Sequence, residues 1–305
     1  MNLPPEIRKR LQELNRGPLT FRKKDPAGSE SPAGSEPGAE ATEHACGEAG
    51  GIARPCGDQA GPVKLEDAVA GEEIASAFGR VYLIRKSASK MMPDAATLLK
   101  HYATVFCEGG MSWREGSLHP DLRPLLDLDP RRVLFLDIET TGLSAQPIFL
   151  IGLMHYTGSD LHLHQFLARD YSEERAMLAS FAERMPNYQA LVTFNGKSFD
   201  VPFIRDRGVA NGIEVEFEGV HVDLLHEARR RWRGKLPDCR LQTLERCLLK
   251  RVRPGDIPGE LIPQAYHDFV HSGNAFQICD IVHHNALDLV AMSEILLHMI
   301  RENDE

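Results

Sequence analysis

The sequence predicts an α/β fold in which a mixed central sheet is flanked by helices, preceded by a disordered acidic linker. Three strand-like segments follow one another between residues 132 and 166, and helix-like and strand-like segments alternate after them. The composition is typical of a globular protein, because 42% of the residues are hydrophobic and 26% are charged. The order of segments and the composition together exclude a fibrous or collagen-like chain.

The first part of the chain contains little that would form a core. Residues 1–24 are expected to be an arm with a short amphipathic helix at 5–16, and residues 25–64 a disordered linker. Between residues 25 and 62 there are seven acidic residues and one arginine, and the only large aliphatic residue is Ile52. Such a segment cannot bury enough apolar surface to offset the entropy lost on ordering it.

Ordered structure is expected from residue 65 onwards. Residues 65–117 should form a small α+β extension, with a strand at 80–85 and a helix at 94–106, and the main domain should span 118–305. Strands of the main domain are predicted from apolar and β-branched runs, at 132–138, 147–156, 161–166 and 190–194. Helices are predicted from apolar spacing and capping residues (with Ser172 as the cap of the first), at 172–185, 198–207, 228–232, 241–249, 263–272 and 275–301.

The net charge of −9 conceals a basic region. Residues 226–253 contain ten lysines and arginines against three acidic residues, a local charge of +7. This segment is a candidate track for a nucleic-acid strand, formed by Arg229, Arg230, Arg231, Arg233, Lys235 and Arg240. Trp232 lies among them, and the sequence leaves two interpretations open: the ring stacks on a base, or it packs on the core.

The cysteines and the hydropathy pattern favour a soluble, cytoplasmic protein that does not act at a membrane. The six cysteines form no C-x-x-C pair, which predicts reduced thiols. No apolar run approaches the ~20 residues of a membrane span, and the first residues lack a signal-peptide core.

The strongest local signal for chemistry is a pair of acidic residues at the end of an apolar strand. Asp137 and Glu139 are two residues apart, so their side chains share one face of the strand. Like charges held together repel unless one carboxyl group keeps a proton or a cation neutralises both. The alternative is a strand end that reaches solvent. The apolar run before the pair favours a site for a hard cation at the edge of a sheet.

Two further signals lie on later elements. Asp200 follows a strand and a glycine turn that contains Asn195 and Lys197, polar residues at the same predicted sheet edge. In the last helix, His284 and Asp288 are four residues apart and share a face, which alone is equally compatible with an exposed ion pair.

These segments together resemble one family. Asp137 with Glu139, Asp200 and Asp288 follow the order and setting of the three Exo motifs of DEDD exonucleases, which have a ribonuclease H-like fold. The chain resembles the YprB-type ribonuclease H-like exonuclease domain over about residues 118–300, in the segments FLDIETTGL, FNGKSFDVPFI, DLLHEARRRWRGKLPDCRLQTLE, GDIPGELIPQAY and HNALDL.

The resemblance implies a 3′–5′ exonuclease that hydrolyses DNA or RNA single strands from their 3′ ends with two divalent cations, Mg²⁺ or Mn²⁺. It implies that the four acidic residues hold the cations. A histidine near the last of them would orient or deprotonate the attacking water, and its ordinary pKa of about 6.5 suits that role. Helical spacing favours His284, with His283 as the alternative. The resemblance implies substrate contacts by Thr140, Leu143, Asn195 and Lys197.

The alternative hypothesis is a nucleic-acid-binding module of the same fold without catalysis. A pseudoenzyme is expected to have lost at least one acidic residue. All four are present together with a histidine, which favours the enzyme.

Overall fold

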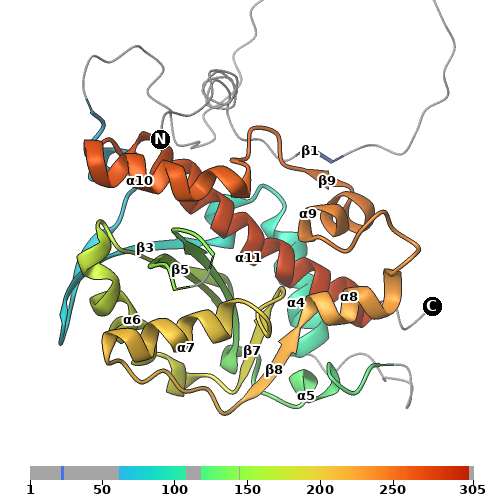
Figure 1. Cartoon of the computed structure of the whole chain (residues 1–305). Helices are drawn as coiled ribbons and strands as arrows, with labels where there is room; N and C mark the ends of the chain where they lie inside the picture. The colour runs from blue at the N-terminus through green and yellow to red at the C-terminus, as the bar shows by residue number, and fades with distance from the viewer. Residues whose placement is uncertain (1–21, 24–61, 108–117, 144, 302–305) are drawn as a thin grey trace, which may run out of the picture.

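The structure is a computed structural model (Figure 1). It describes residues 22–23, 62–107, 118–143 and 145–301. The helix expected at 5–16 and nearly all of the linker expected at 25–64 therefore lie outside the described residues.

A seven-stranded mixed sheet forms the centre of the molecule. Its strands are β2 (Glu72–Ser76), β3 (Gly79–Ser87), β4 (Val133–Thr140), β5 (Ile148–Tyr156), β6 (Leu161–Leu167), β7 (Ala190–Thr193) and β8 (Val220–Asp223). They lie in the order β2-β3-β6-β5-β4-β7-β8. β4, β7 and β8 are parallel, and the other neighbours pair antiparallel. The expected mixed sheet is thereby confirmed.

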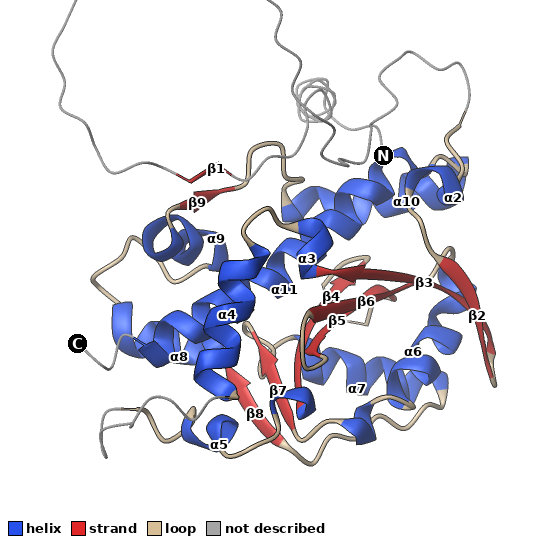
Figure 2. Ribbon diagram, turned by 180° about the vertical axis from the view of Figure 1, so that it is seen from behind, coloured by secondary structure: helices blue, strands red, loops and turns tan. Residues whose placement is uncertain are grey.

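Helices cover both faces of this sheet (Figures 1 and 2). α6 and α7 lie on one side, and α4, α10 and α11 lie on the other. The principal helices are α4 (Ala95–Phe106), α6 (Glu174–Ala182), α7 (Asp200–Asn211), α8 (Leu224–Trp232), α10 (Ile262–Ser272) and α11 (Ile278–Arg301). Short helices are α2 (Leu65–Ala68), α3 (Ala88–Met91), α5 (Arg123–Leu126) and α9 (Leu241–Leu244), and a π-helical turn follows at Glu245–Leu249.

The central strand β4 explains why the site lies where it does. Its first four residues, 133–136, are at most 1% exposed, because a strand covered on both faces is apolar throughout. Leu134 and Leu136 belong to the core cluster that includes α6 and α7. Phe135 points to the cluster that includes α4 and the second half of α11. By the two-residue period of a strand, Asp137 and Glu139 share the face of Phe135 and therefore lie on the α11 side.

Several element boundaries differ from the expected ones. β2 and β8 were not predicted. The side chain of Asp170, and not Ser172, accepts the capping hydrogen bond before α6, from the Ser172 amide at 2.8 Å. α8 begins at Leu224, four residues earlier than expected, because the Asp223 side chain caps it.

The residues expected to form a separate extension contribute to the same sheet. β3 pairs with β6 from Tyr82 opposite Leu167 to Ser87 opposite His162. At the N-terminus, β1 (Arg22–Lys23) pairs with β9 (Arg251–Val252). In the part of the chain that the structure describes, no helix has the length and apolar character needed to cross a membrane.

Candidate functional site

The four acidic residues singled out in the sequence come from three elements that meet at one edge of the sheet. Asp137 and Glu139 end β4, Asp200 is the first residue of α7, and Asp288 lies in α11. Asp200 is 4% exposed and the others are half-buried. The sequence spacing alone did not reveal that α11 crosses the sheet at this point.

Burial and the charges of neighbouring carboxylates raise the pKa values of Asp137, Glu139 and Asp200. Burial, followed by the charges of Asp288, Glu139 and Asp200, raises the pKa of Asp137 well above its usual range. Burial raises the pKa of Glu139 to about 8 and that of Asp200 to about 7, and neighbouring carboxylates add to both shifts. Carboxyl groups held this close together either retain their protons or bind cations, because both reduce the repulsion between them.

Asn285 holds Asp137 in place. Its Nδ2 atom donates to Asp137 Oδ2 at 2.7 Å and to the Asp137 carbonyl oxygen at 3.3 Å. Its Oδ1 atom accepts a hydrogen bond of 2.8 Å from Gln165 Nε2. Asn285 and Gln165 are both fully buried, so this chain of hydrogen bonds leaves Asp137 little freedom.

Gly152 makes room for this arrangement. It lies opposite Asp137 in the β4–β5 pair, and a β-carbon at this position would be 2.0 Å from Asn285 Oδ1.

We expect Gly152→Ala to displace Asn285 and lower the melting temperature. Overpacking of this kind costs about 1–3 kcal/mol. The same substitution at Gly158, where nothing lies within 4 Å but the backbone φ is +107°, measures the cost of backbone strain alone. A smaller loss for Gly152→Ala than for Gly158→Ala would contradict the packing argument.

His284 is the histidine that reaches the acidic cluster. Its Nδ1 atom lies 2.9 and 3.0 Å from the two oxygens of Asp256, and its Nε2 atom lies 3.6 Å from Asp288 Oδ2. Burial alone would lower its pKa, but Asp288, the hydrogen bond to Asp256 and Glu139 raise it to about 9. The pKa is therefore not the ordinary value expected from the sequence, because three carboxylates surround the ring.

His283 occupies a different environment. Burial, followed by the charge of Lys86, lowers its pKa to about 4. The helix is continuous from Ile278 to Arg301, so His283 and His284 point in different directions around its axis. The structure thus brings His284, and not His283, to Asp288.

Sequence reasoning missed a buried ion-pair network beside the site. Arg253 Nη1 lies 2.5 Å from Asp288 Oδ1 and 3.4 Å from Asp256 Oδ2, and its Nη2 lies 2.6 Å from Glu245 Oε2. Arg253 had been counted in the basic track, but only 5% of its side chain is exposed. Asp256 belongs to the segment GDIPGE, which was noticed only through the family resemblance. An acidic residue in a loop offers no local pattern that indicates its partner.

The turn after β7 is held by Asp223. Its carboxylate accepts hydrogen bonds from the backbone amides of Asn195 at 2.9 Å and Lys197 at 3.0 Å. Asn195 adopts a left-handed φ of 69°, a conformation that Asn tolerates well. The Lys197 side chain is exposed. Asp223 was not predicted, and it fixes two of the four residues expected to contact substrate.

The other two expected contact residues follow Glu139. The Thr140 hydroxyl donates to the Gly142 carbonyl at 2.8 Å, which shapes the turn. Leu143 is 83% exposed.

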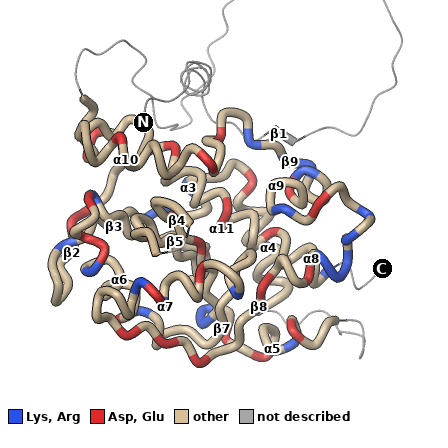
Figure 3. Tube along the Cα trace, in the orientation of Figure 1, with Lys and Arg blue, Asp and Glu red and all other residues tan. Residues whose placement is uncertain are grey.

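The basic segment follows α8 and the loop after it (Figure 3), and its residues divide into exposed and buried ones. Arg229, Arg230, Arg233, Lys235 and Arg240 are exposed, and Arg231 is half-buried. Trp232 is only 6% exposed and packs in the core near His298, with 6.1 Å between ring centroids. The base-stacking interpretation of Trp232 is therefore wrong, because the amphipathic helix α8 buries this face against α11.

Comparison with known proteins identifies the family. A family model described as the RNase_H superfamily matches residues 134–300. The chain belongs to this superfamily. Within the RNase H superfamily, it is similar to the uncharacterized protein YprB of Bacillus subtilis (strain 168). The two are 32% identical over 175 residues, which cover 56% of this chain and 42% of YprB. The expected YprB-like, ribonuclease H-like domain is confirmed.

Two DNA polymerases are more distant matches. DNA polymerase 1 of Sulfurisphaera ohwakuensis is 25% identical over 111 residues, which cover 32% of this chain and 13% of the polymerase. The solved family B DNA polymerase of the hyperthermophilic archaeon Pyrobaculum calidifontis is 17% identical. The match covers 53% of this chain and 24% of the polymerase chain, with a TM-score of 0.43. The chain thus spans less than half the length of the curated relatives that it matches.

Proposed function

We propose that this chain is a metal-dependent 3′–5′ exonuclease that hydrolyses phosphodiester bonds in single strands of DNA or RNA. The observation that carries the proposal is the meeting of four carboxylates from β4, α7 and α11 at one sheet edge. Burial and the charges of neighbouring carboxylates raise the pKa values of Asp137, Glu139 and Asp200, so the folded protein holds these groups together against repulsion. An arrangement maintained at such a cost is typical of a functional site.

The chemistry of these side chains fits hard divalent cations, which prefer carboxylate oxygens. Asp137, Glu139, Asp200 and Asp288 would hold two ions of Mg²⁺ or Mn²⁺. When bound, such ions neutralise the carboxylates, lower the pKa of a coordinated water and stabilise the leaving oxygen.

The protein's own residues would orient the reactants. Asp256 fixes the ring of His284 through Nδ1, so that Nε2 faces the acidic cluster, where it would orient the attacking water. It would accept the proton of that water only once bound cations offset the carboxylates that keep the ring protonated. Arg253 holds the other oxygen of Asp288, Oδ1. The exposed Leu143 would pack on the terminal nucleotide, and Lys197 would contact a phosphate.

A single assay tests the proposal. Single strands of DNA and RNA, each labelled at the 5′ end, are incubated with the protein and Mg²⁺. We expect products that shorten stepwise from the 3′ end, with no reaction in EDTA. Binding without Mg²⁺-dependent shortening would instead support the non-catalytic module. Internal cuts as first products would support an endonuclease and overturn the proposed polarity.

The same carboxylates predict how the metal-free protein responds to pH. Glu139 and Asp200 keep their protons up to about pH 8 and 7 in the folded state, whereas the unfolded chain loses them near pH 4. His284 keeps its proton up to about pH 9, against about 6.5 when unfolded. At these three sites the folded protein binds more protons between about pH 4.5 and 9. Burial lowers the pKa values of His164, His221 and His283 to about 4, and these groups offset the effect below about pH 6.5. The free energy of unfolding must therefore fall as the pH rises from about 6.5 to 9.

Melting temperatures measured in EDTA check this expectation. They should be higher near pH 6.5 than near pH 8.5, and Mg²⁺ should raise the value near pH 8.5 more strongly than near pH 6.5. Asp137→Asn in EDTA should melt no lower than the parent near pH 8.5, because one like-charge contact is relieved. A melting temperature that rises with pH over this range in EDTA would contradict the expectation.

A further inference from the structure

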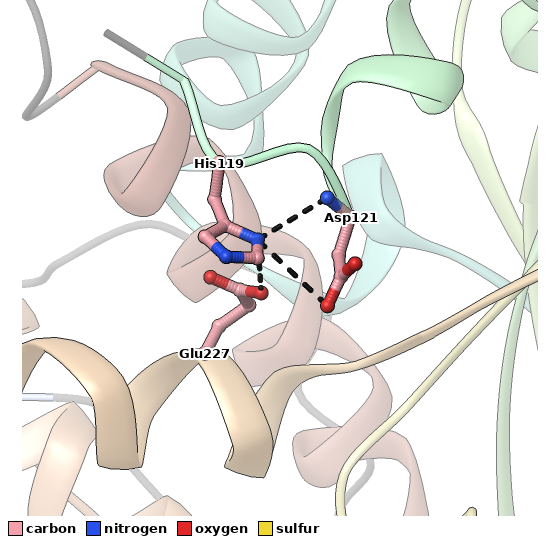
Figure 4. Close-up of side chains that lie close together, drawn as sticks. All are labelled: His119, Asp121 and Glu227. Atoms are coloured by element: carbon pink, nitrogen blue, oxygen red, sulfur yellow. Dashed lines mark hydrogen bonds and ion pairs between the residues drawn. The ribbon is translucent and has the colours of Figure 1, made fainter.

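A second group of potential metal ligands lies outside the acidic cluster (Figure 4). His119 and Asp121 lie in the segment that leads into α5, and Glu227 lies in the first turn of α8. One ligand atom from each comes within 4.8 Å of the others. His119 Nδ1 is 3.3 Å from Glu227 Oε1 and 3.7 Å from Asp121 Oδ2. None of the three residues belongs to the proposed catalytic site.

These separations match those between ligands of one metal ion. Two ligand atoms, each about 2.0–2.2 Å from a tetrahedral Zn²⁺, lie roughly 3.3–3.6 Å apart. The Asp121 amide donates a hydrogen bond of 3.2 Å to His119 Nδ1, and a metal ion bound at this nitrogen would take the place of that hydrogen bond. The two carboxylates beside the ring repel one another unless a cation compensates them.

Glu227 makes this group different from a set of surface charges. Its side chain is only 2% exposed, and its Oε2 atom has no hydrogen-bond partner among the residues that the structure describes. A carboxylate buried in this way is costly unless it is paired or coordinates a metal. Its other oxygen, Oε1, faces His119, as the dashed line in Figure 4 shows.

Arg230 supplies the compensating charge in this structure. Its Nη2 atom lies 2.8 Å from Glu227 Oε1 and 2.9 Å from Asp121 Oδ2, and its Nη1 atom contacts the His119 ring. The Arg230 side chain is 40% exposed, so it can leave the group for solvent without a buried space remaining. One flexible cation thus occupies the position that a metal ion would take.

We propose that His119, Asp121 and Glu227 form a binding site for a divalent cation of the Zn²⁺ type, for which Arg230 is a built-in competitor. One imidazole nitrogen with two carboxylates suits Zn²⁺ better than Mg²⁺, which prefers oxygen ligands alone. A bound ion ties residues 118–122 to α8 and releases Arg230 to the exposed basic surface.

Zinc titration of the full chain tests this site separately from the catalytic one. All variants carry Asp137→Asn and Glu139→Gln, which weakens metal binding by the acidic cluster equally in each. Zn²⁺ is titrated in competition with a chromophoric chelator, and the parent is compared with Glu227→Gln, Asp121→Asn and Arg230→Met. Cysteines and histidines elsewhere contribute equally to all four proteins.

We expect the parent to bind one Zn²⁺ more than Glu227→Gln. Arg230→Met should bind that ion about tenfold more tightly, because a positive charge no longer competes. If Glu227→Gln does not fold, the Asp121→Asn variant replaces it, because Asp121 is exposed. This variant should also bind one Zn²⁺ fewer than the parent. Equal stoichiometry and affinity in the parent and both carboxylate variants would overturn the proposal. So would an Arg230→Met protein that melts at a lower temperature and binds Zn²⁺ no more tightly, because Arg230 would then be a structural clamp.

Discussion

Asp137→Asn should reduce Mg²⁺-dependent hydrolysis to the background of the assay. Metal-assisted stabilisation of the transition state contributes several kcal/mol. Its loss therefore corresponds to a reduction of the rate constant by a factor on the order of 10³ or more. The fold should be unaffected. The new amide oxygen still accepts the hydrogen bond from Asn285 Nδ2, and the volume of the side chain is unchanged.

Rates of nucleotide release and melting temperatures measured on the same preparations check this result. Asp206→Asn is the matched control, because Asp206 is an exposed acidic residue of α7. It should keep the parent rate. Hydrolysis by Asp137→Asn within a factor of two or three of the parent would remove Asp137 from the mechanism and with it the metal arrangement proposed above.

His284→Ala should lower the rate constant of hydrolysis by about 10²–10⁴, the usual contribution of a positioned acid–base group. The adjacent substitution, His283→Ala, is the matched control. Both histidines are largely buried in α11, but only His284 contacts Asp288 and Asp256. His283→Ala should therefore change the melting temperature more than the rate. Metal binding should survive both changes, because neither histidine is proposed as a ligand.

Asp256→Asn distinguishes an oriented His284 from one that merely fills space. The amide keeps the volume but loses the negative charge that faces Nδ1, so the ring is held less firmly in the orientation that presents Nε2. We expect a lower kcat with little change in KM. If His283→Ala is the inactive variant, or if both histidine variants stay active, the assignment of His284 is wrong.

The strands and long helices could be predicted because their signals are local. The apolar run before Asp137 and the two-residue period that follows predicted β4 and the common face of its acidic residues. β8, in contrast, has only four residues at the edge of the sheet, two half-buried and two buried, so it shows no alternation that the sequence could reveal. The position of Trp232 could not be predicted either, since a tryptophan among arginines is equally compatible with base stacking and with burial in the core.

The candidate site could be predicted as far as its motifs extend. Asp137, Glu139, Asp200, His284 and Asp288 were predicted from local motifs together with the family resemblance that these motifs carry, and the fold brings them to one edge of the sheet. Their partners were not named. Asn285, Gln165, Arg253, Asp256 and Asp223 are polar residues whose roles depend on a neighbour 26 to 148 positions away in the chain.

Local sequence was thus sufficient to identify the kind of fold and the acidic residues, because strand and helix periods and strand-end carboxylates are properties of neighbouring residues. Which histidine faces Asp288, whether Arg253 reaches solvent or a buried carboxylate, and how Gly152 admits Asn285 depend on α11 crossing β4 and β5. These are contacts between distant segments, and their energies arise from burial and charge in three dimensions. No pattern of neighbouring residues contains that information.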